Sequence, residues 1–330
     1  MDILELAQEI IDGRRIKRGE DLSFFITCDL DKLCKGADQI RSMLIGDKVD
    51  LCSIINGRSG KCPENCKYCA QSAHHQTNCE VYDFLPVDTI LQNCKMNESE
   101  KVDRFSIVTA GRSLDNEEFE KAIETYKILK ENTRIDLCAS MGFITREQMR
   151  RLKEVGVTSY HHNIETSKRF FPSICTTHTY EMKMETLKMV KEEGLCVCSG
   201  GIIGMGETWE DRLDMAISLS EVPAESIPIN ALMPINGTPL EGQKPLTEDE
   251  ILRTIAIFRY INPEANIRLA AGRALLTNDG ELAFRSGASA TITGNMLTTA
   301  ACATIRSDRQ MLEKLNRDVT PEYWKTGSGL

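Results

Sequence analysis

The chain has 330 residues, and its 40 lysine and arginine side chains against 49 aspartate and glutamate side chains give a formal net charge of −9. This acidic balance argues against a broad electrostatic contact with nucleic acid or anionic lipid, so we expect a small-molecule partner. Segment 1–15 is acidic and helix-periodic, unlike a secretory signal, and no apolar run is long enough to cross a membrane. We therefore expect a cytoplasmic protein whose 13 cysteines are thiols or metal ligands.

Strand-like segments alternate with helix-like segments along most of the chain. The predicted strands cover 50–56, 104–110, 135–141, 159–165, 196–204, 226–233, 266–272 and 288–294. Between them, segments such as 113–132, 145–156 and 179–194 have apolar residues at three- and four-residue spacing, which predicts helices. Because no G-x-G-x-x-G follows the first strand, this alternation favours an α/β (β/α)8 TIM-type barrel over an open doubly wound sheet.

We expect one domain over 1–330, because no Pro- or Ser-rich linker interrupts the alternation. A helical N-terminal extension is predicted over 1–49, the barrel over 50–304, and a C-terminal capping helix with a polar tail over 305–330.

Cys62, Cys66 and Cys69 have the spacing C-x3-C-x2-C just after the first predicted strand. That position is a loop at the C-terminal mouth, where barrel active sites form. A closed zinc site would need a fourth ligand, which His74 or His75 could supply, but paired C-x2-C knuckles do not recur in the chain. Three thiolates suit three irons of a [4Fe–4S] cluster and leave the fourth iron open to a substrate or cofactor. The spacing favours the cluster, with zinc as the alternative, because both metals accept thiolates.

An aromatic residue, Tyr68, precedes the last cysteine of this trio. Such a trio in the first loop of a barrel resembles the radical S-adenosylmethionine superfamily. The segments KCPENCKYCAQSAHH, YHHNIETS, VCSGGIIGMGET, INALMPINGTPL and IRLAAGR are similar, in order and wording, to those of the biotin synthase family over nearly the whole chain.

This resemblance implies an activity and a set of partners. The open iron of the cluster would chelate S-adenosylmethionine, whose cleavage gives a 5′-deoxyadenosyl radical. The radical would take hydrogen atoms from dethiobiotin, and sulfur from an auxiliary iron–sulfur cluster would close the ring of biotin. The resemblance also implies a flavodoxin- or ferredoxin-type reductant and a homodimer.

The resemblance assigns cofactor contacts to residues near the barrel mouth. The pattern G-x-I-x-G-x-x-E is formed by Gly200, Ile202, Gly204 and Glu207. In the superfamily this pattern lies along the fifth strand and supports the adenosine, and Tyr68 belongs to the same cofactor site. Taken alone, these glycines equally suit a tight turn at a strand end.

Two further groups of polar residues are candidates for the same site. Asn163 and Glu165 fall two apart, so a strand over 159–165 would point both inward, toward the cofactor ribose and the substrate, and His162 outward as a structural residue. Asn230 resembles a family position that contacts the ureido ring of the substrate. Its alternative role is to satisfy backbone groups at the strand end.

Three cysteines, Cys52, Cys138 and Cys198, fall within predicted strands. A strand cysteine alone is usually a small buried hydrophobe. Biotin synthases hold an auxiliary [2Fe–2S] cluster by three strand cysteines and one arginine, and the resemblance matches Cys138, Cys198 and Arg268 to that set. Cys196 shares the parity of Cys198 and is a weaker substitute for it.

The third family cysteine is replaced here by Ser106, a poor iron ligand. Cys52 stands on the first strand at a position that is commonly serine in the family. We infer a moved ligand, with an auxiliary cluster bound by Cys52, Cys138 and Cys198, and with Arg268 as a ligand or a nearby donor. This set resembles the form in strict anaerobes, whose auxiliary cluster is larger and carries an extra sulfide.

The other cysteines are interpreted as incidental: Cys28, Cys34, Cys79, Cys94, Cys175 and Cys302. Two alternative functions stay open at this point. One is a biotin-synthase-like maturase of the same superfamily, and the other is a non-catalytic iron–sulfur or zinc protein.

Overall fold

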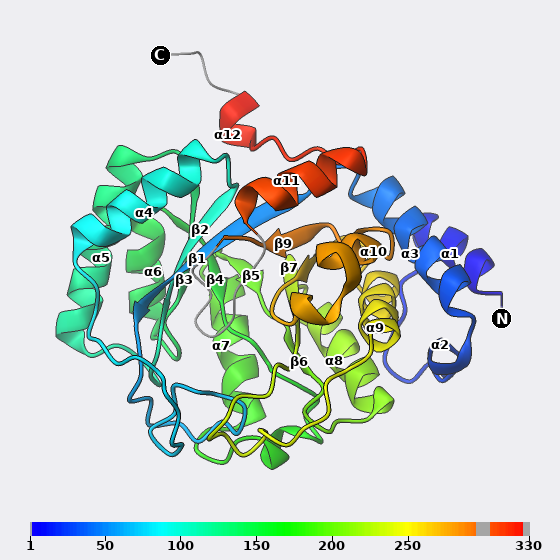
Figure 1. Cartoon of the computed structure of the whole chain (residues 1–330), viewed down its shortest axis with the longest axis horizontal. Helices are drawn as coiled ribbons and strands as arrows, with labels where there is room; N and C mark the ends of the chain where they lie inside the picture. Colours follow the sequence, from blue (N-terminus) through cyan, green and yellow to red (C-terminus); the bar gives the residue numbers. More distant parts are fainter. Residues whose placement is uncertain (1, 295–303, 326–330) are drawn as a thin grey trace.

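The computed structural model describes residues 2–294 and 304–325 and shows a closed barrel of parallel strands surrounded by helices (Figure 1). The strands are β1 (Asp50–Arg58), β2 (Arg104–Thr109), β3 (Asp136–Ser140), β4 (Val157–His161), β5 (Cys196–Cys198), β6 (Gly201–Ile203), β7 (Ser226–Ala231), β8 (Asn266–Leu269) and β9 (Ala290–Ile292). β5 and β6 are two halves of the fifth barrel strand, and both pair with β7, so β7, β8 and β9 are the sixth, seventh and eighth barrel strands. The pairing of β1 with β9 completes the ring and confirms the predicted (β/α)8 architecture.

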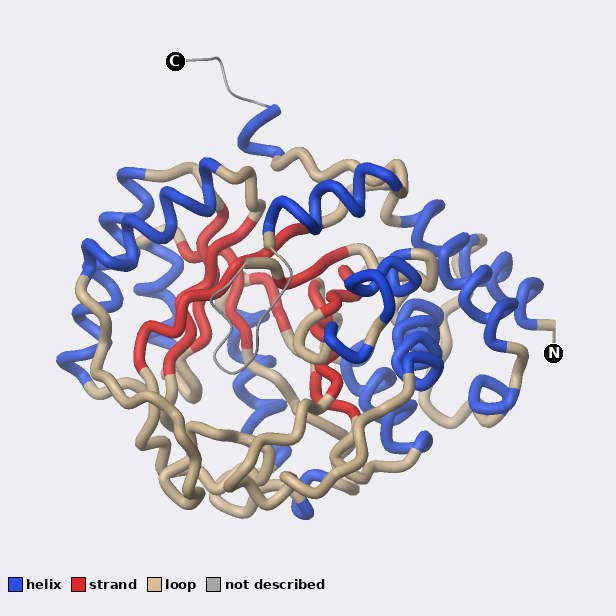
Figure 2. Tube along the Cα trace, in the orientation of Figure 1, coloured by secondary structure: helices blue, strands red, loops and turns tan. Residues whose placement is uncertain are grey.

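Helices enclose the ring of strands on its outside (Figure 2). The α-helices are α1 (Ile3–Ile11), α2 (Phe24–Thr27), α3 (Leu30–Leu44), α4 (Val87–Ser99), α5 (Asn116–Asn132), α6 (Arg146–Glu154), α7 (Tyr180–Glu192), α8 (Trp209–Glu221), α9 (Glu248–Ile261), α10 (Glu281–Phe284), α11 (Ile305–Lys314) and α12 (Glu322–Lys325). Short 3-10 turns are η1 (Phe171–Ser173), η2 (Arg273–Leu275) and η3 (Thr277–Gly280). Within the described ranges, no helix combines the length and apolar character needed to cross a bilayer.

The helices that follow the strands begin at side chains that satisfy their first backbone N–H groups. Thr145, Thr208 and Thr247 form capping boxes with Gln148, Asp211 and Glu250 at α6, α8 and α9. Losing such a cap typically costs about 1 kcal/mol. These caps fix where each βα loop ends, and the loops build the mouth of the barrel.

The N-terminal extension packs against the outside of the barrel through α3 and α9 (Figure 1). Gly36 of α3 makes this approach possible, because a Cβ there would lie 1.9 Å from the Tyr260 hydroxyl oxygen. That hydroxyl donates to the Ile3 carbonyl at 2.9 Å and so connects α1 to α9, the helix that carries Tyr260. The expected helical extension and α11 are both present, and the single-domain description stays a prediction.

Two predicted strands differ from the structure at the mouth. β4 ends at His161, not at residue 165, and Glu165 has a left-handed φ of 72°. Regular pairing with the fifth strand stops at His161 and resumes as a single bridge at Glu165, whose N–H donates to the Gly200 carbonyl. The predicted strand 196–204 is interrupted at 199–200, where a Cβ on Gly200 would lie 1.9 Å from the Pro228 carbonyl oxygen.

Candidate active site

The loop after β1 holds the three cysteines of the C-x3-C-x2-C motif at the mouth of the barrel. Its turns are fixed by backbone bonds: the Cys62 N–H donates to Gln71 at 2.9 Å, and the Cys69 N–H donates to Cys66 at 3.0 Å. All three thiols are half-buried and free of disulfides. Burial raises the pKa of Cys62, and burial together with the nearby Cys62 raises the pKa of Cys69 to about 11. Without a metal these thiols stay protonated, and a bound cation is what would stabilise their thiolates.

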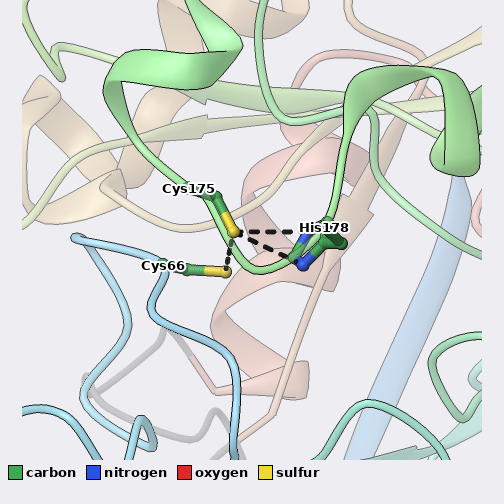
Figure 3. A group of neighbouring side chains, drawn as sticks. All are labelled: Cys66, Cys175 and His178. Atoms are coloured by element: carbon green, nitrogen blue, oxygen red, sulfur yellow. Dashed lines mark hydrogen bonds between the residues drawn. The ribbon is translucent and has the colours of Figure 1, made fainter.

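A second loop, over 171–179, packs against this cysteine loop. The Lys67 N–H donates to the Ile174 carbonyl at 2.9 Å, and the Asn65 side-chain oxygen accepts from the Thr176 N–H at 2.9 Å. These bonds place Cys175 beside the trio, with its Sγ 3.7 Å from Cys66 Sγ (Figure 3). The sequence analysis interprets Cys175 as incidental, whereas the structure places it against a cysteine of the motif, a contact across 109 residues that has no local signal in the sequence. Cys302 lies outside the described residues.

Glu165 lies beside Tyr68 of the cysteine loop, and one oxygen of its carboxylate is an acceptor without a hydrogen-bond partner among the described residues. Burial raises the pKa of Tyr68 well above its usual value, and the hydrogen bond to Glu165 adds to this shift. Glu165 faces Lys183 of α7 with a separation of 3.6 Å at Oε1, while its buried Oε2 has no hydrogen-bond partner among the described residues. A buried carboxylate oxygen without a donor is costly, and a ribose hydroxyl would supply that donor. The site therefore fits the expected cofactor at this point.

The other predicted mouth residues mainly hold the strand ends together. Asn163 accepts from the Gly200 N–H at 3.0 Å, and Asn230 donates to the Gly201 carbonyl at 3.0 Å. Glu207 accepts from the Gly204 and Met205 N–H groups, each at 2.8 Å, and from Arg212 at 2.8 Å. Gly204 needs its positive φ of 94° for this turn. Ile202 of β6 is half-buried against the core. These contacts shape the cofactor loop through the backbone.

Inside the barrel, a cavity of about 100 Å³ is lined by ligand-type side chains. They include Cys52, Cys138, Cys198 and Arg268, together with Ser106, His161 and Cys196. Burial raises the pKa of Cys52 to about 12 and also raises that of Cys138, and each of these shifts is increased by the nearby Cys198. The three predicted thiols thus lie close together and face one enclosed space.

Strand register shows that four of these side chains form one layer of the barrel. In such barrels, alternate strands contribute the members of a layer. Cys52 of β1 pairs with Arg104, which pairs with Asp136, and two residues further along β3 is Cys138. The same step leads from Cys138 to Cys198 of β5, then to Arg268 of β8, and back to Cys52.

Ser106 belongs to the neighbouring layer, one step closer to the mouth. The second, fourth, sixth and eighth barrel strands (β2, β4, β7 and β9) fill this layer with Ser106, His161, Pro228 and Ile292. The thiols of Cys52, Cys138 and Cys198 therefore belong, with Arg268, to the layer of the first, third, fifth and seventh barrel strands, and Ser106 lies outside that layer.

Arg268 is held in place by several acceptors of the barrel. Its Nη2 is 2.5 Å from Asp50 Oδ1, its Nη1 donates to the Asp50 and Thr291 carbonyls, and its Nε donates to Ser226 Oγ at 3.1 Å. Burial disfavours the Asp50 carboxylate, but Arg268 and Arg104 outweigh it and lower the pKa of Asp50 to about 2. The guanidinium partly offsets the effect of burial on the pKa of Cys52 and of Cys198. A cation beside soft thiols fits a group of negative charge.

Two inward residues were missed by the sequence analysis. His161 has the parity of Asn163 and faces the cavity, with Nδ1 3.3 Å from Cys198 Sγ, and burial lowers its pKa to about 4. Asn56 has the parity of Cys52, and its buried Oδ1 has no partner among the described residues. Parity within a strand could have found both. His162 packs its ring edge against Phe143 at 4.9 Å, in agreement with a structural role.

Comparison with known proteins identifies the family of the chain. Residues 58–219 match the Radical SAM superfamily, and residues 228–318 match the Biotin and Thiamin Synthesis associated domain. A biotin synthase of Alkaliphilus metalliredigens (strain QYMF) is 59% identical over 315 residues, covering 96% of this chain and 99% of that protein. The chain belongs to the biotin synthase family. A biotin synthase of Clostridium beijerinckii is also 59% identical, over 94% of this chain and 98% of its own length.

Family membership identifies the protein as an enzyme, a radical S-adenosylmethionine sulfurtransferase, and confirms the resemblance drawn from its motifs. The superfamily match implies a [4Fe–4S] cluster and S-adenosylmethionine as cofactors. The alternative of a non-catalytic iron–sulfur or zinc protein is left without support.

Solved structures agree on the fold. A methylornithine synthase has a TM-score of 0.81 at 19% identity, covering 96% of this chain and 97% of its own. The hydrogenase maturase HydG has a TM-score of 0.81 at 15% identity, covering 96% and 74%. These likenesses show the barrel alone and do not favour the maturase alternative.

Proposed function

We propose that the protein converts dethiobiotin to biotin with sulfur from an auxiliary iron–sulfur cluster held by Cys52, Cys138 and Cys198. The observation that carries this proposal is the barrel layer in which these three cysteines and Arg268 occupy all four positions. A layer of a TIM-type barrel is normally filled by bulky branched side chains. Three thiols and a guanidinium around a cavity instead favour a bound soft-metal group.

In this proposal Arg268 acts as a fixed charge, and Asp50 orients it. Each of its three nitrogens already donates to a protein acceptor, and a nitrogen would have to lose a proton before it could bind iron directly. Its charge favours the thiolate forms of Cys52 and Cys198, which are the forms that bind iron. Of the two roles expected for Arg268, the structure thus supports the nearby donor.

The trio Cys62, Cys66 and Cys69 would hold the catalytic cluster, which when bound supplies the electron that cleaves S-adenosylmethionine. Glu165 Oε2 would accept a ribose hydroxyl of the cofactor, and Tyr68 would keep the carboxylate in position. Lys183 Nζ lies 3.6 Å from the other carboxylate oxygen. Gly200, Ile202, Gly204 and Glu207 would form the surface beneath the adenosine.

Asn163 and Asn230 would contact the ureido ring of dethiobiotin. Each amide already holds a backbone group, so each can offer the substrate only its remaining donors or lone pairs. This fixes the amides before substrate arrives, which lowers the entropy cost of binding. A flavodoxin- or ferredoxin-type reductant and a homodimer remain part of the proposal.

The test compares Cys52→Ser with Ser106→Ala, two substitutions in the same cavity. We expect Cys52→Ser to remove iron and sulfide from the auxiliary site, to spare cofactor cleavage, and to abolish biotin formation. Ser106→Ala should change none of these, because its hydroxyl binds no iron. Anaerobic iron and sulfide counting with Mössbauer spectroscopy is the measurement. A folded Cys52→Ser variant with full auxiliary iron and normal biotin yield would contradict the ligand set.

A further inference from the structure

A third group of ligand atoms joins one thiol of the cysteine loop to two residues that have no role in the proposed reaction (Figure 3). Cys175 points between Cys66 and His178, with its Sγ 3.7 Å from Cys66 Sγ, 3.4 Å from His178 Nδ1 and 3.7 Å from His178 Nε2. The ligand atoms of all three residues lie within 4.8 Å of one another. Neither Cys175 nor His178 belongs to the cysteine motif or to the auxiliary layer.

The separations of these atoms match the edges of a tetrahedral zinc site. With Zn–S bonds of about 2.3 Å and Zn–N bonds of about 2.0–2.1 Å, tetrahedral angles place two sulfurs about 3.8 Å apart and a sulfur and a nitrogen about 3.6 Å apart. The Cys66–Cys175 distance of 3.7 Å lies within a few tenths of an ångström of the first value. Cys175 Sγ lies beside both nitrogens of His178, so an ion could enter between the two sulfurs once the imidazole turns to direct Nε2 at it.

The carboxylate of Glu64 completes the arrangement around His178. Its Oε2 lies 2.5 Å from His178 Nδ1, which leaves Nε2 as the nitrogen available to a metal. A carboxylate on the far nitrogen is the usual partner of a metal-binding histidine, because it fixes the ring and its tautomer. Glu64 is itself buried and held by Arg112 at 2.8 Å. Glu64 thus favours the tautomer with the proton on Nδ1 and leaves Nε2 as the metal-binding nitrogen.

We propose that Cys66, Cys175 and His178 bind one tetrahedral divalent metal ion of the zinc class while the catalytic cluster is absent. Three protein ligands leave one position for water. Since Cys66 would also serve the cluster, which rests on the proposed function, this ion and the cluster compete for one thiol. A chain loaded with zinc would then assemble its catalytic cluster slowly until the ion leaves.

The test titrates the cluster-free full-length chain with Co²⁺, a spectroscopic substitute for Zn²⁺, under anaerobic conditions. We expect one bound equivalent to depend on Cys175 and His178, to show sulfur-to-metal charge-transfer bands and intense tetrahedral ligand-field bands, and to be displaced by zinc. Cys175→Ser and His178→Gln should each weaken binding at least about ten-fold, as loss of a metal-site residue does. Circular dichroism and thermal unfolding establish that each variant is folded.

Matched controls separate this site from the cysteine trio. Cys62→Ser and Cys69→Ser should leave Co²⁺ binding unchanged, as should Cys79→Ser, whose thiol contacts Ser59 instead. Co²⁺ binding that survives in Cys175→Ser and His178→Gln but fails in Cys62→Ser would overturn the proposal. So would X-ray absorption of the zinc-loaded wild type that shows three sulfurs and no nitrogen, a measurement that needs no variant.

A second readout keeps this inference distinct from the proposed function. Zinc loaded before reconstitution should slow assembly of the catalytic cluster in the wild type and not in Cys175→Ser. Biotin formation by a chain that binds no Co²⁺ at these residues would leave the proposed function intact and reject the metal site. Cobalt binding at these residues in a chain that makes no biotin would support the metal site and reject the proposed function.

Discussion

Asp50 is the residue through which the auxiliary layer can be disturbed without touching a thiol. It begins β1, is 8% exposed, and accepts from Arg268 at 2.5 Å and from Arg104 at 2.8 Å. Asp50→Asn removes the charge that both guanidinium groups face. Breaking a buried ion pair from one side costs about 3–5 kcal/mol. The fall of the Asp50 pKa from 3.8 to about 2 corresponds to about 2 kcal/mol at neutral pH.

The pH dependence of this loss has a definite sign. Because the pKa of folded Asp50 lies below its unfolded value, its contribution is complete above the unfolded pKa and disappears as the pH falls through the folded pKa. The difference between wild type and Asp50→Asn should therefore be full at neutral pH and should shrink between about pH 4 and about pH 2.

Urea unfolding of the cluster-free chain measures this difference, which avoids any contribution from bound iron. Glu117→Gln is the control, because Glu117 pairs with Lys121 on the exposed face of α5, and its loss should change the unfolding free energy by less than about 0.5 kcal/mol. A loss under about 1 kcal/mol for Asp50→Asn, or a difference that stays constant down to low pH, would refute the reasoning.

Three other substitutions probe the mouth of the barrel. Gly200→Ala would push a Cβ to 1.9 Å from the Pro228 carbonyl oxygen and should cost about 2 kcal/mol or more in urea unfolding, whereas Gly242→Ala, with nothing within 4 Å, should be neutral. Asn230→Ala breaks its bonds to Gly201 and Ala271, so it should cost about 1–3 kcal/mol and weaken dethiobiotin binding in calorimetry. S-adenosylmethionine binding should stay nearly unchanged, and equal losses of both ligands would make Asn230 purely structural. Alanine at any one of Cys62, Cys66 and Cys69 should abolish 5′-deoxyadenosine formation after anaerobic reduction. Formation at the wild-type rate would exclude these cysteines as the cluster ligands.

The sequence predicts the barrel well because every βα repeat carries the same local signals. Apolar strands, capped helices and the position of the cysteine loop after the first strand are all properties of short segments. The prediction fails where the chain stops being a regular strand. Alternation placed Asn163 and Glu165 on one side, but β4 ends at His161, and the left-handed φ of Glu165 breaks the two-residue period. Its carboxylate consequently faces Tyr68 and Lys183.

Contacts between distant segments are the other part that the sequence could not supply. Cys175 and His178 carry no motif of their own, and only the packing of loop 171–179 on the cysteine loop brings them to Cys66. Their spacing from Cys66 in the chain gives no hint of this. The inward position of His161, in contrast, could have been predicted, since His161 has the parity of the predicted inward residue Asn163.

Barrel register also gives a chemical reason for a cluster ligand at Cys52 on β1 in place of one at position 106 on β2. A thiol at position 106 would lie on β2, directly beside Cys138 on β3 and in the layer closer to the mouth. A thiol at Cys52 lies instead in the layer of Cys138 and Cys198, on alternate strands around the ring. Three thiols spaced in this way can each hold a different iron of a larger cluster, and the Ser106 layer lies between them and the mouth. An extra sulfide on the mouth side of the cluster, beside the small side chain of Ser106, would face the incoming substrate. We therefore expect more than two irons per auxiliary site, and Mössbauer spectra that account for only two would argue against this geometry.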